Sequence, residues 1–398
     1  MTTHDHDHES TQDELDLGAS ISTGIQQVRG GFASSRLTQA RLLQGLSKAE
    51  VARELKVSAS AVGQWEAGIQ APRPYLLLRL AELLEVPAEF FVLGRPYARL
   101  NAATAHFRSL RRTSASQRDK AVAFVEQLWE LTYALEKRIE LPVVDLPGMT
   151  TGGDQVPGIL PADPVGAARS LRCAWQIPPG PFPHLIRNLE NHGIVVSHVP
   201  FAGDATATID AFSTSHLPRP LVVTTPDRAN DVYRHRFTAA HELGHLLLHH
   251  DAAPGDIQQE READTFAAEL LTPITEIAEE LPTRLHLSAL DPVAHKWGVS
   301  IASLIRRMSE LGLTSDISSR RAYQRYEQLR ASGAIQPEPI ALYPGESPVL
   351  LRRAFEVAEE HGLLTLPQLA DELVWPITRV RLLLGLDTRR PRLTLVKV

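Results

Sequence analysis

The chain has 398 residues, a length that predicts two to three folded domains and excludes a single small domain. Hydrophobic residues make up 43% and charged residues 22%, a composition that excludes a largely disordered or membrane-embedded protein. The formal net charge is −6, but residues 1–20 hold six acidic side chains and no Lys or Arg, so the rest of the chain is neutral. A neutral body can still carry a basic surface that binds nucleic acid.

The single cysteine, Cys173, cannot form a disulfide within the chain, so we expect a protein of the reducing cytoplasm. The N-terminal segment is acidic where a signal peptide would be basic and then apolar, and no run of about 18 apolar residues is present. We therefore predict a cytoplasmic location and no membrane partner. Residues 1–31 also lack hydrophobic periodicity, which predicts a disordered acidic tail.

Residues 32–95 carry apolar residues at the spacing of short amphipathic helices, which predicts a domain of five helices. Ser47 and Ser58 are suited to cap two of these helices, and Glu50 completes a capping box with Ser47. The two helices are connected only by Lys56-Val57. So short a connection between capped helices is typical of a helix-turn-helix.

This segment resembles the XRE-family, or lambda-repressor-like, DNA-binding domain over residues 34–93, most specifically in Trp65-Glu66-x-Gly68 and Pro72-Arg73-Pro74. The resemblance implies that helix Ser58–Glu66 lies in the major groove of an operator, so double-stranded DNA is the expected partner. Side-chain chemistry then predicts base contacts from Ala59, Ser60 and Gln64, and phosphate contacts from Lys48, Arg53 and Arg73. The alternative is a protein-interaction or dimerisation module, and a homodimer is compatible with both roles.

Two connecting segments follow. Residues 96–140 are rich in arginine and include a predicted helix, Ser116–Glu140, so we expect a basic connector helix, and residues 141–163 form a Pro/Gly linker. Residues 164–290 then mix predicted helices with three runs rich in Val, Ile and Thr. These runs are typical of strands, which predicts one α+β domain with a small sheet: Gly193–Val199, Ala207–Phe212 and Pro220–Thr225.

The strongest chemical signal in this domain is His241-Glu242-Leu243-Gly244-His245, inside the predicted helix Val232–His250. His241 and His245 are four residues apart, so both imidazoles lie on one helix face and can bind one tetrahedral Zn²⁺ at about 2.0–2.1 Å. Glu242 lies beside that face, where its carboxylate can take a proton from metal-activated water. The pattern predicts a zinc site with Glu242 as its catalytic base.

The next predicted helix, Ile257–Leu271, offers the third metal ligand. Glu260 and Asp264 are four residues apart and share a face, whereas Glu262 points largely to the opposite side. We predict that Glu260 binds the metal and that Asp264 accepts the far ring N–H of a ligand histidine, with Glu262 as the alternative ligand. His249 shares the face of the two ligand histidines, but we interpret it as a helix-end histidine outside the metal set.

Residues 164–273 resemble the ImmA/IrrE family of zinc metallopeptidases, because His-Glu-Leu-Gly-His, Leu-Leu-Leu-His and Glu-x-Glu-Ala-Asp-x-Phe occur in the family's order. The resemblance implies a gluzincin-like fold in which His241, His245 and Glu260 hold Zn²⁺ and Glu242 is the general base. It also implies endopeptidase action on a bound transcriptional repressor. We therefore interpret the α+β domain as a zinc metallopeptidase domain.

Residues 291–398 show helical patterns throughout, including one predicted helix over Pro292–Leu311, and we expect a sensing or interaction region there. The predicted fold class is therefore multidomain and mainly α, with one α+β domain. One function that fits is a transcriptional regulator whose zinc-dependent endopeptidase cleaves a repressor or other regulatory protein. The alternative is a DNA-binding regulator whose peptidase-like domain senses a ligand or metal without proteolysis. We favour the first, because a purely structural zinc site has no need of Glu242.

Overall fold

The computed structural model describes residues 31–92, 94, 106–107, 115–148, 160–198, 211–215, 217–224, 231–249 and 256–386. The predicted acidic tail up to residue 30, much of the basic connector ahead of residue 115 and part of the Pro/Gly linker lie outside the described residues. No helix among the described residues is long and apolar enough to cross a membrane. The chain divides into two compact units, the first made of Met1–Arg99, Arg118–Arg138 and Phe355–Val398, the second of Leu100–Gln117 and Ile139–Ala354.

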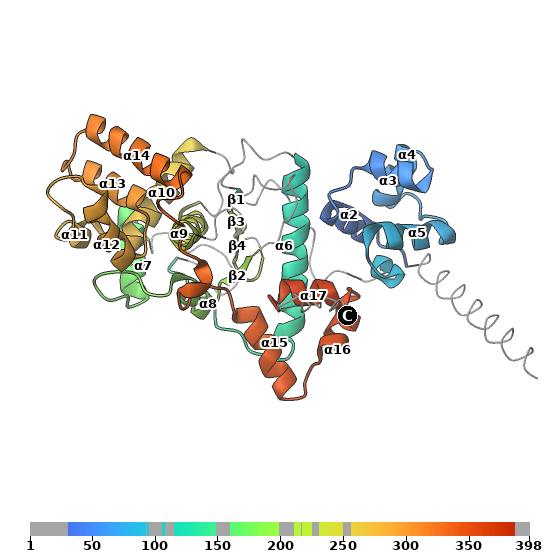
Figure 1. The fold of residues 1–398 in the computed structure, drawn as a ribbon. Coiled ribbons are helices and arrows are strands. Elements are labelled where there is room, and N and C mark those ends of the chain that lie inside the picture. Colours follow the sequence, from blue (N-terminus) through green and yellow to red (C-terminus); the bar gives the residue numbers. More distant parts are fainter. Residues whose placement is uncertain are drawn as a thin grey trace, which may run out of the picture. The chain divides into compact units, whose positions relative to one another are not determined.

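The N-terminal part of the first unit is a small helical domain (Figure 1). Its described elements are α2 (Ser34–Leu43), α3 (Lys48–Leu55), α4 (Ala59–Glu66), α5 (Pro74–Leu84) and the 3₁₀ helix η1 (Ala88–Val92). The predicted five-helix domain is confirmed, with the fifth helix in 3₁₀ form. Its core is formed by apolar side chains that are completely buried, among them Leu37, Val51, Val62, Leu77 and Leu80.

The connection between α3 and α4 follows the predicted capping. Ser47 Oγ accepts the N–H of Glu50 at 3.2 Å and the Glu50 carboxylate accepts the N–H of Ser47 at 2.7 Å, so the capping box is confirmed. Lys56 ends α3 in the left-handed region, with φ of 56°. Ser58 then caps α4 by accepting the N–H of Ala61 at 3.1 Å. The tight turn of a helix-turn-helix is thus formed by local hydrogen bonds.

A buried ion pair joins α2 to the long helix α6 (Ala115–Glu136) within the first unit. Nη1 of Arg36 lies 2.8 and 2.7 Å from the two carboxylate oxygens of Glu130, and Nη2 donates to the carbonyl of Gly94 at 2.7 Å. Both side chains are almost fully buried, so each charge depends on the other. The last described helices of the chain are α15 (Leu350–Glu360), α16 (Leu366–Leu373) and α17 (Ile377–Leu383).

A four-stranded sheet lies in the second unit. Its strands are β1 (His106–Phe107), β2 (Val195–His198), β3 (Ala211–Thr214) and β4 (Leu221–Thr224), in the order β1-β3-β4-β2. β2 runs parallel to β4, whereas β3 is antiparallel to both of its neighbours. The small sheet is therefore confirmed. Strand β3 corresponds to the predicted run Ala207–Phe212 but reaches Thr214, and residues 207–210 lie outside the described residues.

Helix α9 (Val232–Leu248) packs against β3, β4, α8 (Leu185–Asn191) and α10 (Ile257–Leu271). Its first turn is capped by Asp231, whose carboxylate accepts the backbone N–H groups of Tyr233 and Arg234. The other described helices of this unit are α7 (Pro164–Ala174), α11 (Ile274–Ile277), α12 (Leu287–Trp297), α13 (Ile301–Glu310), α14 (Asp316–Ala331) and the 3₁₀ helix η4 (Ile340–Leu342). Together these elements confirm a mainly helical fold with one α+β part.

In the turn between α3 and α4 a left-handed residue directly follows one helix and the next helix starts three residues later, and this turn occurs three more times in the described residues. Glu85 (φ 54°) separates α5 from η1, Gly298 (φ 62°) separates α12 from α13, and Val374 (φ 53°) separates α16 from α17. The single helix predicted over residues 292–311 is therefore wrong, because Gly298 ends one helix and Ser300 caps the next. In all four turns the N–H of the left-handed residue bonds to the carbonyl of an alanine four residues earlier: Ala52, Ala81, Ala294 and Ala370.

Candidate metal centre

Helices α9 and α10 bring two histidines and a glutamate together. His241 and His245 lie one turn apart on α9, and Glu260 faces them from the first turn of α10. The Nε2 atoms of the histidines are 3.1 Å apart, and each lies 3.5 Å from a carboxylate oxygen of Glu260. Ligands held at about 2.0–2.2 Å by a tetrahedral Zn²⁺ are about 3.3–3.6 Å from one another. The two histidine–glutamate distances lie within this range and the histidine–histidine distance is 0.2 Å below it, so the three donors are close enough together for one such ion.

Hydrogen bonds on the far side of the histidines decide which ring nitrogens carry protons. Asp264 Oδ1 lies 2.9 Å from Nδ1 of His241, so Nδ1 carries the proton and Nε2 presents a lone pair. Glu262 lies 2.9 Å from Nε2 of His249, whose Nδ1 is 3.0 Å from Nδ1 of His245. Nε2 of His249 therefore carries a proton, and its Nδ1 accepts a hydrogen bond from Nδ1 of His245. This leaves a lone pair on Nε2 of His245. Two lone pairs and a carboxylate thus converge with no proton to share between them, which is the chemistry of a cation site.

Burial and local charge hold the supporting groups in the ionisation states that this arrangement needs. Burial lowers the pKa of His249, while its hydrogen bond to Glu262 opposes that change, so the ring is neutral. Burial raises the pKa of Glu260, but the hydrogen bonds and positive charge that His241 and His245 offer when they are protonated outweigh burial and lower the pKa to about 2. Glu260 is therefore an anionic carboxylate at neutral pH, as a metal ligand must be.

Glu242 is completely buried and lies on α9 beside the three donors. Its Oε2 accepts a hydrogen bond from the hydroxyl of Ser213 at 2.8 Å, and Ser213 is itself completely buried in strand β3. Glu242 is outside the set of described residues whose donor atoms converge, which are His241, His245 and Glu260. Its carboxylate is therefore held in one orientation by the sheet and is available for proton transfer.

Two protein families match the chain. Residues 37–91 match the helix-turn-helix family, and residues 189–309 match the IrrE N-terminal-like domain of the peptidase M78 family. The chain joins an XRE-type helix-turn-helix domain to an ImmA/IrrE-like peptidase domain. Both resemblances seen in the sequence are thereby confirmed. No curated protein sequence matches the chain.

The IrrE-like match extends further than the motifs in the sequence indicate. It begins within α8, includes strands β2–β4 and the whole metal centre, and continues through α12 to the last turn of α13. Arg306 on α13 lies 3.9 Å from Asp264 Oδ2, so the helices that follow the metal site also contact its supporting carboxylate. The resemblance in the sequence ends at residue 273, where its motifs end, and the predicted domain ends at residue 290, where the pattern becomes helical throughout.

In the helix-turn-helix domain, the predicted base-contacting residues lie along one helix. Ala59 and Ser60 are exposed in the first turn of α4, and Gln64 is half-buried one turn later. Arg73 is exposed at the N-cap of α5, and Arg53 is exposed on α3. The assignment of these residues to DNA stays a prediction.

Sequence reasoning missed an ionic cluster that links three helices of this domain. The Glu66 carboxylate on α4 is buried and lies 2.5 Å from Nε of Arg41 on α2. Lys48 Nζ on α3 lies 3.2 Å from the same carboxylate, although the lysine side chain is 48% exposed. Lys48 is thus partly neutralised by Glu66 before it meets any DNA phosphate. The three partners are far apart in the sequence, so no local pattern indicates them.

Gly244 allows helices α9 and α10 to approach closely, and we expect Gly244→Ala to weaken both their packing and the binding of zinc. A Cβ at this position would lie 3.2 Å from Cα of Ala263 and 3.1 Å from the Phe266 ring. Alanine gains about 1 kcal/mol of helix propensity, but overpacking against backbone costs about 1–3 kcal/mol. The expected net loss in the free energy of unfolding is about 1 kcal/mol, from the difference between these terms.

Urea denaturation and a zinc titration measure the two effects. Gly63→Ala is the matched control, because a Cβ on this helical glycine meets no atom within 4 Å and should be neutral or stabilising. A Gly244→Ala protein that is more stable than wild type and binds zinc equally well would contradict the packing argument.

Proposed function

We propose that the chain is a DNA-binding transcriptional regulator whose ImmA/IrrE-like domain is a zinc-dependent endopeptidase. Its proposed substrate is a regulatory protein, and a transcriptional repressor is the first candidate. The observation that carries the proposal is the convergence of His241, His245 and Glu260 beside a buried Glu242 that is not part of the donor set. A structural zinc site needs four ligands and no neighbouring base. A three-ligand site with an adjacent carboxylate is the arrangement of a hydrolytic site.

Zinc bound at these three residues would supply Lewis acidity to a water molecule and to the scissile carbonyl. Glu242 performs the proton transfers, since its carboxylate can accept a proton from the attacking water and deliver it to the leaving amine. Ser213 keeps this carboxylate oriented through its hydrogen bond to Oε2. Asp264 and the pair His249–Glu262 fix the tautomers of the two ligand histidines. Ser213, Asp264, His249 and Glu262 set the orientation and protonation of the groups that they contact. Only Glu242 transfers a proton to or from the reacting molecules.

The exposed start of α4 and the N-cap of α5 support the DNA-binding half of the proposal, which predicts different effects for two substitutions. Gln64→Ala should weaken binding to the preferred operator by about 1–3 kcal/mol and relax its sequence preference, because a base contact is lost. Arg73→Ala should weaken binding to all duplexes and lower the slope of log K against log salt by about 0.9, because one phosphate contact is lost.

Fluorescence anisotropy with a selected operator and a scrambled duplex at two salt concentrations measures both effects. Arg320→Gln, a substitution of an exposed arginine in the second unit, is the control and should leave binding unchanged. Undiminished operator binding by both Gln64→Ala and Arg73→Ala would contradict this docking of α4. Comparison of the wild type with Glu242→Gln tests the proteolytic half, because the reaction alone should be lost.

A further inference from the structure

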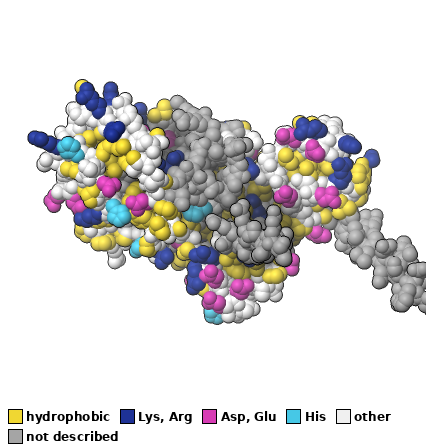
Figure 2. All heavy atoms as spheres, in the orientation of Figure 1, with side chains coloured by type: hydrophobic (Ala, Val, Ile, Leu, Met, Phe, Trp, Pro, Cys, Tyr) yellow, Lys and Arg dark blue, Asp and Glu magenta, His cyan; other side chains and the backbone are white. Residues whose placement is uncertain are grey.

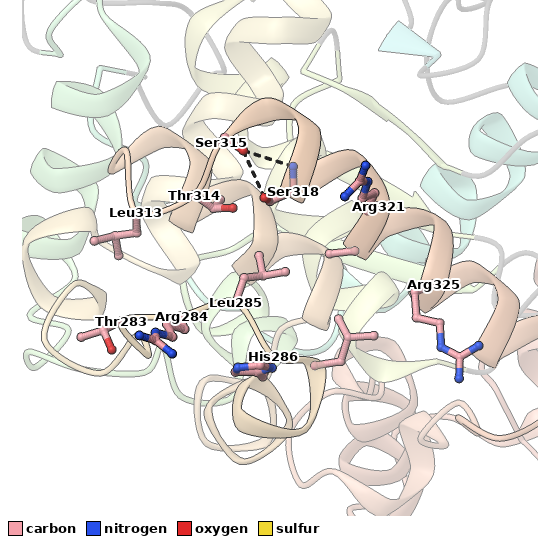
Figure 3. A pocket seen from close by; sticks show the side chains of 12 residues that line it. Thr283, Arg284, Leu285, His286, Leu313, Thr314, Ser315, Ser318, Arg321 and Arg325 are labelled. Atoms are coloured by element: carbon pink, nitrogen blue, oxygen red, sulfur yellow. Dashed lines mark hydrogen bonds between the residues drawn. The ribbon is translucent and has the colours of Figure 1, made fainter.

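A surface cavity of about 590 Å³ lies in the helical part of the second unit that follows the metal centre. It is bounded by the segment that leads into α12 and by the start of α14 (Figure 3). Arg284 and His286 enter it from the first segment, and Arg321 and Arg325 enter it from α14. None of the described residues that line it is acidic. The cavity is therefore strongly cationic.

The side chains of the three arginines of this cavity have no hydrogen-bond or ion-pair partner among the described residues, a condition that they share with the exposed Arg261 and Arg320 of the same unit. Within the part of the chain that the structure describes, the guanidinium groups of Arg284, Arg321 and Arg325 make no hydrogen bond or ion pair. Arg330, on the same helix, reaches the carboxylate of Asp231 at 3.3 Å. Arg321 and Arg325 are four residues apart and share a helix face, where like charges repel. An anion bound between them would relieve this repulsion.

Positive side chains also gather on the surface at this end of the unit, over α14 (Figure 2). The cavity itself adds two further kinds of group. Thr283 and Thr314 offer hydroxyl donors, and Leu285 and Leu313 form apolar wall. The volume of about 590 Å³ lies within the range of roughly 300–1,000 Å³ that is typical of small-molecule sites with apolar wall and a few polar groups.

We propose that this cavity binds a small molecule that carries a phosphate or diphosphate group and an apolar portion. A single carboxylate brings one negative charge, which is too little to neutralise three guanidinium groups. A phosphate monoester brings a charge of about −1.5 to −2 and three strong acceptor oxygens at neutral pH. The planar fork of a guanidinium matches phosphate oxygens in pairs. The proposal depends only on the cavity and is independent of the reaction at the metal centre.

Isothermal titration of the full-length protein with inorganic pyrophosphate tests the proposal. Wild type and Arg320→Gln should bind with equal affinity, because Arg320 lies on α14 but does not line the cavity. The double variant Arg321→Gln/Arg325→Gln should bind at least about tenfold more weakly, since it loses two charge-assisted contacts. Both substituted arginines are exposed, so the double variant should fold normally.

Either of two results would overturn the proposal. One is equal pyrophosphate affinity in all three proteins, which would indicate that pyrophosphate binds a metal ion and not the arginines. The other is the absence of saturable binding by the wild type. A parallel titration with duplex DNA separates the two sources of phosphate. If the double variant loses affinity for DNA and keeps its affinity for pyrophosphate, the arginines bind a nucleic-acid backbone and the small-molecule proposal is wrong.

Discussion

Glu242→Gln should stop cleavage of the protein substrate and leave the fold and the zinc content unchanged. The amide has nearly the shape of the carboxylate and can still accept the hydrogen bond that Ser213 donates at 2.8 Å. It cannot accept a proton from water, and loss of a general base costs about 10²–10⁴-fold in rate. Glu242 does not belong to the converging donor set, so the metal affinity should change little.

The measurement is the rate of product formation by purified wild type and Glu242→Gln with the same candidate substrate, together with zinc content and unfolding midpoint. Glu279→Gln is the matched control, because it removes one carboxylate at an exposed position of the same unit. Equal rates for wild type and Glu242→Gln would favour the sensor without proteolysis. Loss of zinc from Glu242→Gln would show that this carboxylate acts as a ligand.

His245→Ala should remove most of the zinc affinity. It deletes one of three converging donors and also breaks the contact from His249, whose Nδ1 lies 3.0 Å from Nδ1 of His245. Loss of a supporting partner alone lowers metal affinity by about 10–100-fold, so loss of a ligand should exceed 100-fold. Asp264→Asn should fall in the smaller range, because Asp264 is not one of the converging donors and reaches the site through its hydrogen bond to Nδ1 of His241.

Competition with a chromophoric chelator measures these affinities. His361→Ala is the control, because His361 is an exposed histidine that belongs to the first unit and should leave zinc binding unchanged. The expected order of affinity is wild type and His361→Ala, then Asp264→Asn, then His245→Ala. An unchanged affinity in His245→Ala would contradict the three-ligand site.

Features that depend on residues close in the sequence could be predicted. The capping box of Ser47 and Glu50 follows from their separation of three residues, and the shared face of His241 and His245 follows from the helical period. The same period distinguishes Glu260 from Glu262 on α10, and the structure directs Glu262 to His249. Local geometry is enough for these features because a helix fixes the direction of each side chain.

Contacts between distant elements could not be predicted in this way. Ser213 lies in a strand 29 residues before Glu242, and its hydroxyl is indistinguishable in the sequence from that of any strand serine. The partners of His249 also depend on how α10 packs against α9, which Gly244 makes possible. The end of α12 was missed for a different reason: apolar residues continue at the helical period across Gly298, so periodicity alone concealed the turn.

Metal analysis, combined with a comparison of new protein N-termini in cells that carry wild type or Glu242→Gln, tests the proposed zinc-dependent endopeptidase. We expect similar zinc content in both purified proteins and at least one regulatory protein that is cleaved only in cells with wild type. Identical sets of N-termini in the two cell populations, with zinc present in both proteins, would contradict the proposal.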